Sequence, residues 1–327
     1  MKAFVLEYGE LKLKEMPEPE PAANEIVVKL KTAGLNRRDT YIPKRRGSNK
    51  EALILGSDGA GIVEKTGEAV TRFQPGDEVI INPSLNWYDN CDAPPEGFDI
   101  LGMPDHGTFA EKIVIHEEQL EKKPEYLSWE EAGVLALAAL TGYRALVTKG
   151  QVQAGETVFI PGAGSGVNTF IIQFAKQLGA RVIVTSRSEE KRNKSKEIGA
   201  DLAIPTDSDW KKELEKETVD LVIDSVGAAT FNRSLDVLKK GGRIVIYGAT
   251  AGDVVDFDLR KFFYGQFKLF GSTMGSREEL RELLTFMEKH KIRPILDRAF
   301  PLDDADEAFE HLQVNHQFGK IVLNMEK

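Results

Sequence analysis

Small residues between 162 and 168 interrupt an otherwise apolar pattern. Residues 157–160 predict a buried strand and residues 167–178 a helix. The turn between them consists of Gly162, Ala163, Gly164, Ser165, Gly166, Val167 and Asn168. Glycines let the backbone approach a pyrophosphate, and the amides at a helix start favour its negative charge. We expect this turn to bind a dinucleotide, the alternative being a glycine-rich turn without a ligand. Asn168 stands where a last glycine is expected, which puts the close approach of helix and strand in question.

The strand that follows ends in a hydroxyl and a cation. Residues 181–186 predict this strand, about twenty residues beyond the glycines, where an acid would bind the ribose 2′-hydroxyl of NAD. Here the chain has Ser186 and Arg187, with Lys191 one turn later. A guanidinium suits a 2′-phosphate, so the sequence predicts NADP(H) as the cofactor. Alternatively, Arg187 and Lys191 are solvent-exposed residues at the start of a surface helix and bind no ligand. The acids at 189 and 190 would repel a phosphate.

The order of predicted elements changes along the chain. The first 120 residues predict short strands and turns, typical of a β-rich domain. Capping boxes at 128–131 and 276–279 predict helices over 133–147 and up to about 290. Between them, strands at 157–160, 181–186, 202–204, 219–224 and 243–247 alternate with helices at 167–178, 189–198, 209–216 and 228–238. This alternation predicts an α/β fold with a parallel, doubly wound sheet.

Composition excludes several classes of function. The formal net charge of −9 opposes nucleic-acid binding, and we read the basic run Lys44-Arg45-Arg46 as a solvated loop. No apolar run approaches the ~20 residues of a membrane span. The N-terminus lacks a signal-like segment and Cys91 is the single cysteine, so we expect a cytoplasmic protein.

Ordered motifs along the whole chain resemble the medium-chain dehydrogenase/reductase superfamily. They lie at residues 33–39, 55–63, 75–79, 107–111, 140–143, 162–168, 241–245 and 319–322. The resemblance implies a GroES-like catalytic domain over 1–124, a Rossmann NADP(H)-binding domain over 125–269 and a return to the catalytic domain over 270–327. It also implies a homodimer joined through the cofactor domains.

The ligands of the family's catalytic zinc are replaced in this chain. Matched by motif, the ligand positions of the alcohol dehydrogenase branch correspond to Asn36, Ser57 and Leu137, and none is a good zinc ligand. Asp58 keeps the place of the neighbouring acid. A different site built from Cys91, His106 and His116 is the weaker alternative, so no metal is predicted.

The resemblance is closest to the zinc-free, quinone oxidoreductase-like branch. Such enzymes send hydride from NADPH to quinones or to α,β-unsaturated carbonyl compounds, aligning donor and acceptor in a dry cleft between the domains. We predict that Asn36 and Tyr41 contact the acceptor, the alternatives being a helix-start or turn residue for Asn36 and a half-buried barrel aromatic for Tyr41. Asp39 is a general acid or a structural carboxylate. Near the nicotinamide the resemblance places Tyr247, Gly248, Ser272 and Thr273. Two alternatives remain open: a non-catalytic NADPH-binding protein and an alcohol dehydrogenase-like enzyme.

Overall fold

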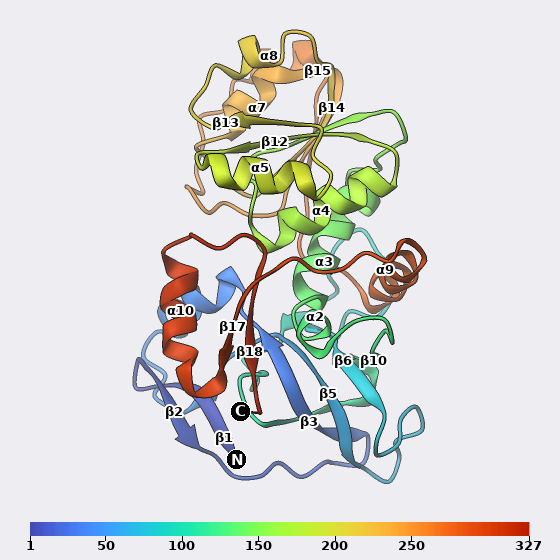
Figure 1. Ribbon diagram of the computed structural model, residues 1–327, viewed down its shortest axis with the longest axis vertical. Helices are drawn as coiled ribbons and strands as arrows, with labels where there is room; N and C mark the ends of the chain where they lie inside the picture. The colour runs from blue at the N-terminus through green and yellow to red at the C-terminus, as the bar shows by residue number, and fades with distance from the viewer. Residues whose placement is uncertain (327) are drawn as a thin grey trace. The chain divides into compact units, whose positions relative to one another are not determined.

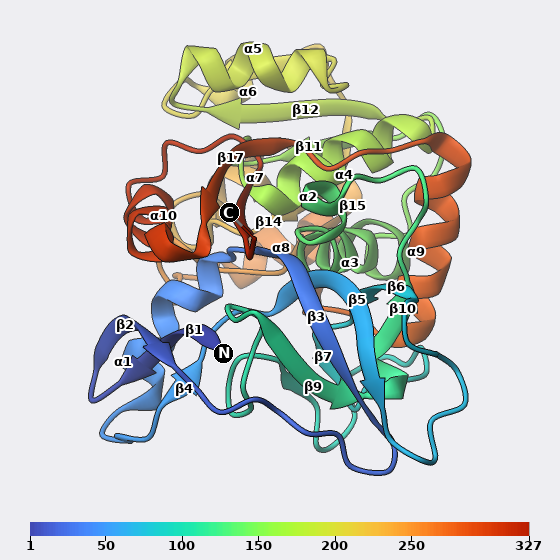
Figure 2. The same cartoon turned by 60° about the horizontal axis from the view of Figure 1, so that its bottom comes forward.

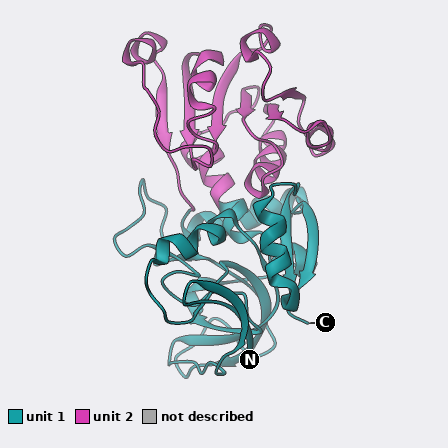
Figure 3. Ribbon diagram, turned by 90° about the vertical axis from the view of Figure 1, so that its left-hand side faces the viewer, with its two compact units in different colours: residues 1–140, 275–327 teal, residues 141–274 magenta. Residues whose placement is uncertain are grey.

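The computed structural model describes residues 1–326 and contains two compact units. Unit 1 comprises residues 1–140 and the segment from Gly275 onward, and unit 2 comprises residues 141–274 (Figure 3). Unit 2 is thus a continuous stretch of chain inserted between two parts of unit 1. The domain boundaries expected at 124 and 269 stay a prediction.

Unit 1 is built on sheets whose strands are antiparallel except for the parallel pair β17 and β18. One sheet has the order β10-β6-β5-β3-β18-β17, with β9 also paired to β3, a second has the order β2-β1-β4, and β7 pairs with β8. The strands are β1 (Lys2–Glu7), β2 (Glu10–Glu15), β3 (Glu25–Gly34), β4 (Leu53–Ile54), β5 (Asp58–Thr66), β6 (Glu78–Ile81), β7 (Ser84–Leu85), β8 (Asp99–Ile100), β9 (Lys112–His116), β10 (Leu120–Lys122), β17 (Leu296–Pro301) and β18 (Lys320–Asn324). The C-terminal strand β18 runs antiparallel to β3, with Val322 opposite Gly34. The expected return of the C-terminal segment to the β-rich part is confirmed.

Helices and short turns cover these sheets (Figures 1 and 2). They are η1 (Arg37–Tyr41), α1 (Ile42–Arg46), η2 (Glu117–Gln119), α2 (Trp129–Ala132), α9 (Arg277–His290), η4 (Leu302–Asp304) and α10 (Ala305–Gln313). The basic run at 44–46, expected in a loop, lies in α1, because Pro43 at the first turn and the following residues continue η1 as a helix.

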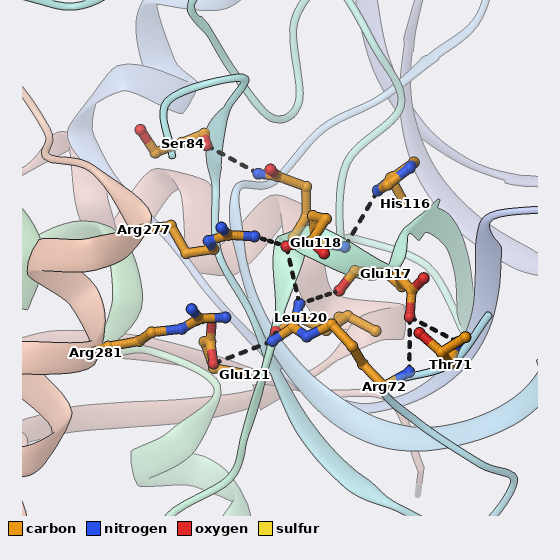
Figure 4. A network of polar contacts seen from close by, with 11 residues as sticks. Thr71, Arg72, Ser84, His116, Glu117, Glu118, Leu120, Glu121, Arg277 and Arg281 are labelled. Atoms are coloured by element: carbon orange, nitrogen blue, oxygen red, sulfur yellow. Dashed lines mark hydrogen bonds and ion pairs between the residues drawn. The ribbon is translucent and has the colours of Figure 1, made fainter. Parts of the chain in front are cut away.

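A network of ion pairs joins α9 to the β10 region of unit 1 (Figure 4). Arg281 Nε donates to Glu121 Oε1 over 2.7 Å, and Arg277 is paired with Glu118. Arg72 Nη1 donates to the carbonyl of Glu117 over 2.9 Å. These contacts tie the returning C-terminal segment to the N-terminal part of unit 1.

The expected helix over 133–147 is divided into several pieces. Ser128 Oγ accepts a hydrogen bond from Glu131 N, confirming the capping box, but α2 ends before Gly133. A Cβ at Gly133 would lie 2.1 Å from Thr32 Oγ1, so the chain passes too close to β3 for any side chain there. The chain continues as α3 (Ala136–Tyr143) and a π-helical segment, Arg144–Lys149.

Unit 2 contains the predicted parallel sheet, with helices between its strands. Its strand order is β13-β12-β11-β14-β15-β16, and every neighbouring pair is parallel. The strands are β11 (Thr157–Ile160), β12 (Arg181–Ser186), β13 (Leu202–Pro205), β14 (Val219–Asp224), β15 (Leu238–Ile246) and β16 (Lys268–Gly271). The helices are α4 (Gly166–Gln177), α5 (Glu189–Glu197), α6 (Trp210–Glu213), α7 (Phe231–Val237) and α8 (Leu259–Gly265). The predicted α/β, doubly wound fold is confirmed.

Among the helices of the described chain, none combines the length and the apolar character needed to cross a bilayer.

Candidate functional site

The glycine turn of unit 2 joins the carboxyl end of β11 to the start of α4. Gly162 and Gly164 have φ values of 81° and 99°, in the left-handed region that favours glycine. Two amides of the turn bond to Thr185 of β12. Gly162 N donates to Thr185 Oγ1 over 3.2 Å, and Ala163 N donates to the Thr185 carbonyl oxygen over 2.7 Å. Ser165 caps α4 by accepting from Asn168 N over 3.1 Å. This is the strand-turn-helix arrangement that a pyrophosphate site requires.

Asn168 braces the turn from inside. Its side chain is buried, and Nδ2 donates to the carbonyl of Gly162 over 2.7 Å. Its Oδ1 accepts from the Tyr247 hydroxyl over 2.5 Å, and burial raises the pKa of Tyr247, so that hydroxyl keeps its proton. The carboxamide therefore links the turn to the end of β15. This accounts for the departure from the usual glycine spacing, since the side chain has its own buried partners.

The carboxyl end of β12 presents a cation and no carboxylate. Ser186 is buried, whereas Arg187 is exposed and has no partner within the described chain. Glu190, one of the two acids expected to oppose a phosphate, is paired with Lys194 over 2.7 Å. Arg192 donates to the Ser186 carbonyl over 2.8 Å, adding a second guanidinium near this strand end.

The remaining cofactor candidates follow β15 and β16. Tyr247 N donates to the Asp224 carbonyl, and Ser272 N donates to the Ile246 carbonyl over 2.9 Å, which aligns the two strand ends. The Ser272 Oγ atom is buried and has no hydrogen-bond partner in the described chain. Gly248, Ser272 and Thr273 thus lie at the same edge of the sheet as the glycine turn. The structure brings these residues to the carboxyl ends of four parallel strands, where α/β sheets bind ligands, and places Lys191 in the first turn of α5.

Unit 1 holds a buried polar cluster at the predicted acceptor site. Lys320 Nζ, with a side chain only 3% exposed, donates to Asn36 Oδ1 over 2.6 Å, to the Leu35 carbonyl over 2.8 Å and to Asp58 Oδ2 over 3.1 Å. Asn36 Nδ2 donates to Asp58 Oδ2 over 2.9 Å and faces the Gly34 carbonyl at 3.3 Å. Asn36 is therefore held on both sides of its carboxamide.

The other positions matched to zinc ligands join this cluster. Leu137 N donates to Asp58 Oδ1 over 2.6 Å. Ser57 is buried, and its Oγ accepts from Arg38 Nη1 over 2.7 Å. Asn36, Ser57 and Leu137 are thus close together, as the motif match implies, but the fixed charges around them are Asp58, Lys320 and Arg38. Within residues 1–326 there is no group of three or more His, Cys, Asp or Glu side chains that could hold a metal ion.

Asp39 and Tyr41 lie on η1 directly after Asn36. Asp39 is fully buried; its Oδ2 accepts from Asn36 N over 2.7 Å, and Oδ1 has no partner in the described chain. Burial raises the pKa of Asp39 to about 6, against the lowering effect of Arg38. Tyr41 is 40% exposed, with the Arg45 guanidinium 6.0 Å from its ring centroid. The contacts of Asn36 and Tyr41 with an acceptor stay a prediction.

Comparisons with known proteins agree with this architecture. Residues 22–125 match the model of the alcohol dehydrogenase GroES-like domain, and residues 166–289 match that of the zinc-binding dehydrogenases. The chain belongs to the medium-chain dehydrogenase/reductase superfamily. It is 31% identical to the acryloyl-coenzyme A reductase of Sulfurisphaera tokodaii, over 95% of this chain and 96% of that protein.

Two solved structures illustrate the range within the superfamily. A structure described as an NAD-dependent alcohol dehydrogenase has a TM-score of 0.92 and 37% identity, covering 99% of this chain and all of that one. The 2-octenoyl-CoA carboxylase reductase CinF, in complex with NADP and 2-octenoyl-CoA, has a TM-score of 0.89 and 27% identity, covering 99% and 87%. This chain is therefore an oxidoreductase of a superfamily that includes both alcohol dehydrogenases and enoyl reductases.

Four polar residues of the two sites were not among the predicted site residues: Lys320, Arg38, Arg192 and Thr185. Lys320 belongs to a recognised motif, but its partners are nearly three hundred positions away in the sequence. Arg192 and Thr185 flank the predicted ribose-binding strand end, so a search of its neighbours for further donors would have found them.

Proposed function

We propose that this protein is a zinc-independent oxidoreductase that uses NADPH to reduce quinones or α,β-unsaturated carbonyl compounds. The observation that carries the proposal is the polar cluster of unit 1, in which Lys320, Asn36 and Asp58 bond to one another. An amide, a hydroxyl and an aliphatic side chain stand at the ligand positions, and zinc prefers thiolate, imidazole or carboxylate. Without a Lewis acid, activated acceptors are favoured over simple alcohols.

The cofactor is NADP(H), held at the carboxyl ends of the strands of unit 2. The glycine turn offers backbone amides to the pyrophosphate, and Arg187 offers an unpaired guanidinium to the 2′-phosphate. When bound, NADPH would supply the hydride for the electron-poor carbon of the acceptor, and a proton would complete the reduction. Tyr41 orients the acceptor carbonyl beside Asn36, whose carboxamide is itself bonded to Lys320 and Asp58. The complex of CinF with NADP and an enoyl thioester supports this combination of cofactor and acceptor.

A panel of acceptors tests the proposal. Purified protein, treated with chelator, is mixed with NADPH and with quinones, enones, enals or enoyl thioesters, and the loss of NADPH absorbance is followed. Steady turnover with at least one of these classes is expected, and no appreciable oxidation of primary alcohols with NADP⁺. Alcohol oxidation with every activated acceptor inert would refute the mechanism. Tight cofactor binding without turnover would identify a non-catalytic protein.

The proposed homodimer forms through the edge of the sheet in unit 2. β16 has a sheet neighbour on one side, and apolar side chains are exposed on it and on the segment that precedes it in the chain: Val254, Leu259, Phe263, Tyr264 and Leu269. Open strand edges pair readily with another chain. Leu269→Glu is expected to convert the dimer to a monomer in light scattering, whereas Val314→Glu, at another exposed apolar position, leaves it unchanged. A wild-type monomer would refute this assembly.

A further inference from the structure

A group of exposed cations follows the predicted acceptor residues along the chain. Residues 37–50 contain six cations and one acid, Asp39, in a chain whose formal net charge is −9. Four of these cations, Lys44, Arg45, Arg46 and Lys50, are on or directly after α1 and are called here the basic patch. Lys44, Arg45 and Lys50 are exposed, whereas Asp39 is fully buried. The charge shown to solvent by this segment is therefore strongly positive.

The basic patch has no carboxylate partners within the described chain. Several other cations of unit 1 are paired, as in the bridges of Lys65 to Glu20 and Lys112 to Glu64. By contrast, Arg46 donates to the carbonyls of Leu6 and Glu51, which fixes its guanidinium without neutralising it. Uncompensated charges of one sign on an acidic protein attract an oppositely charged ligand.

The field of the basic patch reaches two ionisable groups beside it, Arg38 and His106. Burial lowers the pKa of Arg38, and the charge of Arg45 lowers it further, against the opposite effects of Asp39 and Asp58. Burial likewise lowers the pKa of His106, with Arg46 acting in the same direction and Asp105 opposing it. Glu51 is the acid next along the chain, and its side chain is exposed. Four cations therefore outweigh the acids that these contacts identify.

The basic patch is close to the predicted acceptor site along one continuous helical segment. Asn36 precedes η1, Tyr41 ends it, and α1 follows at once. A helical rise of about 1.5 Å per residue puts Arg45 about 6 Å beyond Tyr41 along the axis. The Arg45 guanidinium is 6.0 Å from the Tyr41 ring centroid, so the patch begins where the proposed acceptor contacts end. A substrate tail of modest length would span this distance.

We propose that the natural acceptor carries a phosphate-bearing anionic tail, and that the basic patch binds it while the enoyl group lies at Asn36 and Tyr41. Lysine and arginine are the side chains that bind phosphate, Arg through paired donors and Lys as a point charge. The proposal rests on the enoyl reductase function and specifies the substrate class of the same site. A neutral quinone or enone would leave these cations without a role.

Two thioesters of the same acyl group provide the test. Crotonyl-coenzyme A carries the phosphorylated tail, whereas the crotonyl thioester of N-acetylcysteamine presents the same reacting group without phosphate. The variant Lys44→Gln/Arg45→Gln/Lys50→Gln removes three charges. The matched control, Lys216→Gln/Lys240→Gln/Lys289→Gln, removes three exposed charges elsewhere that form no ion pair in the described chain.

The expected result is selective. Because the patch variant loses three exposed charge contacts, it should raise KM for crotonyl-coenzyme A on the order of tenfold. KM for the short thioester and for NADPH, and kcat for both acceptors, should stay within about twofold. Added salt should raise KM for crotonyl-coenzyme A in the wild type and have less effect in the patch variant. The control variant should match the wild type.

Several outcomes would overturn the proposal. Equal KM values for the two thioesters, unchanged in the patch variant, would refute the anionic tail while leaving the enoyl reductase function intact. A change in KM for NADPH instead would assign the cations to the cofactor. Absence of turnover with every activated acceptor would refute both proposals together.

Discussion

Replacing Lys320 by methionine removes the one cation that, among residues 1–326, bonds directly to Asn36 and Asp58. The ammonium donates to three oxygens within 3.1 Å, and the Asp58 side chain is fully buried. Methionine fills a similar volume but leaves the Asp58 carboxylate and the Asn36 carbonyl without this donor. Removing one partner of a buried ion pair typically costs about 3–5 kcal/mol, so Lys320→Met should lower the free energy of unfolding of unit 1 by that amount.

Urea unfolding measures this loss. Trp87 and Trp129 lie in unit 1 and Trp210 in unit 2, so fluorescence in a Trp210→Phe background reports on unit 1. Lys65→Met is the matched control, because Lys65 pairs with Glu20 at the surface, and it should cost less than about 1 kcal/mol. Asp58→Asn in the Lys320→Met background should cost less than Asp58→Asn alone, because the carboxylate has already lost its counter-ion. A loss below 1 kcal/mol for Lys320→Met, or strict additivity with Asp58→Asn, would show that the cluster is not an energetic unit.

Four further results are expected. Arg187→Ala should weaken NADPH binding about ten- to a hundredfold in titration and leave NADH binding nearly unchanged, because a charge-assisted hydrogen bond contributes about 1.5–3 kcal/mol. Equal losses of affinity for the two cofactors would refute the 2′-phosphate assignment. Metal analysis should find less than stoichiometric zinc, and one tightly bound zinc per chain would contradict the proposal. Tyr247→Phe should raise KM for NADPH with little change in kcat, because Asn168 loses its donor, and an unchanged KM would show that the brace is dispensable. Asp39 has a pKa of about 6 in the folded protein against 3.8 when unfolded, so its ionisation costs up to about 3 kcal/mol of stability as pH rises from 4 to 7. Asp39→Asn should flatten this decline of the free energy of unfolding in urea titrations at several pH values. Parallel pH profiles of wild type and variant would refute the role of Asp39.

Local patterns predicted much of unit 2. The strands at 157–160, 181–186 and 219–224 have the expected bounds, because buried parallel strands are continuous apolar runs between turns. β16 and α8 were not predicted, and their exposed apolar side chains do not form the pattern of a half-buried element. The expected helix over 209–216 is limited to Trp210–Glu213, since little besides Trp210 and Leu214 is apolar there.

The candidate sites also contain a part that the sequence predicted and a part that it did not. The glycine turn and the strand end at Ser186 and Arg187 are adjacent to predicted elements, so their place in the fold followed directly. The partners of Asn36 did not, because Asp58 and Lys320 come from β5 and β18, which meet β3 through long-range pairing. The brace from Tyr247 to Asn168 likewise depends on the order of parallel strands, which residue spacing alone does not specify.

The insertion of unit 2 between the two parts of unit 1 has a consequence for synthesis on the ribosome. Unit 2 is one uninterrupted stretch of chain, so it can fold as soon as its own residues have emerged. Strand β3 is made early, but its neighbour β18 is made only after the whole of unit 2, and Lys320 arrives with it. Until then Asp58 lacks its cation and one edge of β3 is open. A nascent chain should therefore acquire its nucleotide fold first and remain dependent on protection of its N-terminal strands until translation has passed β18.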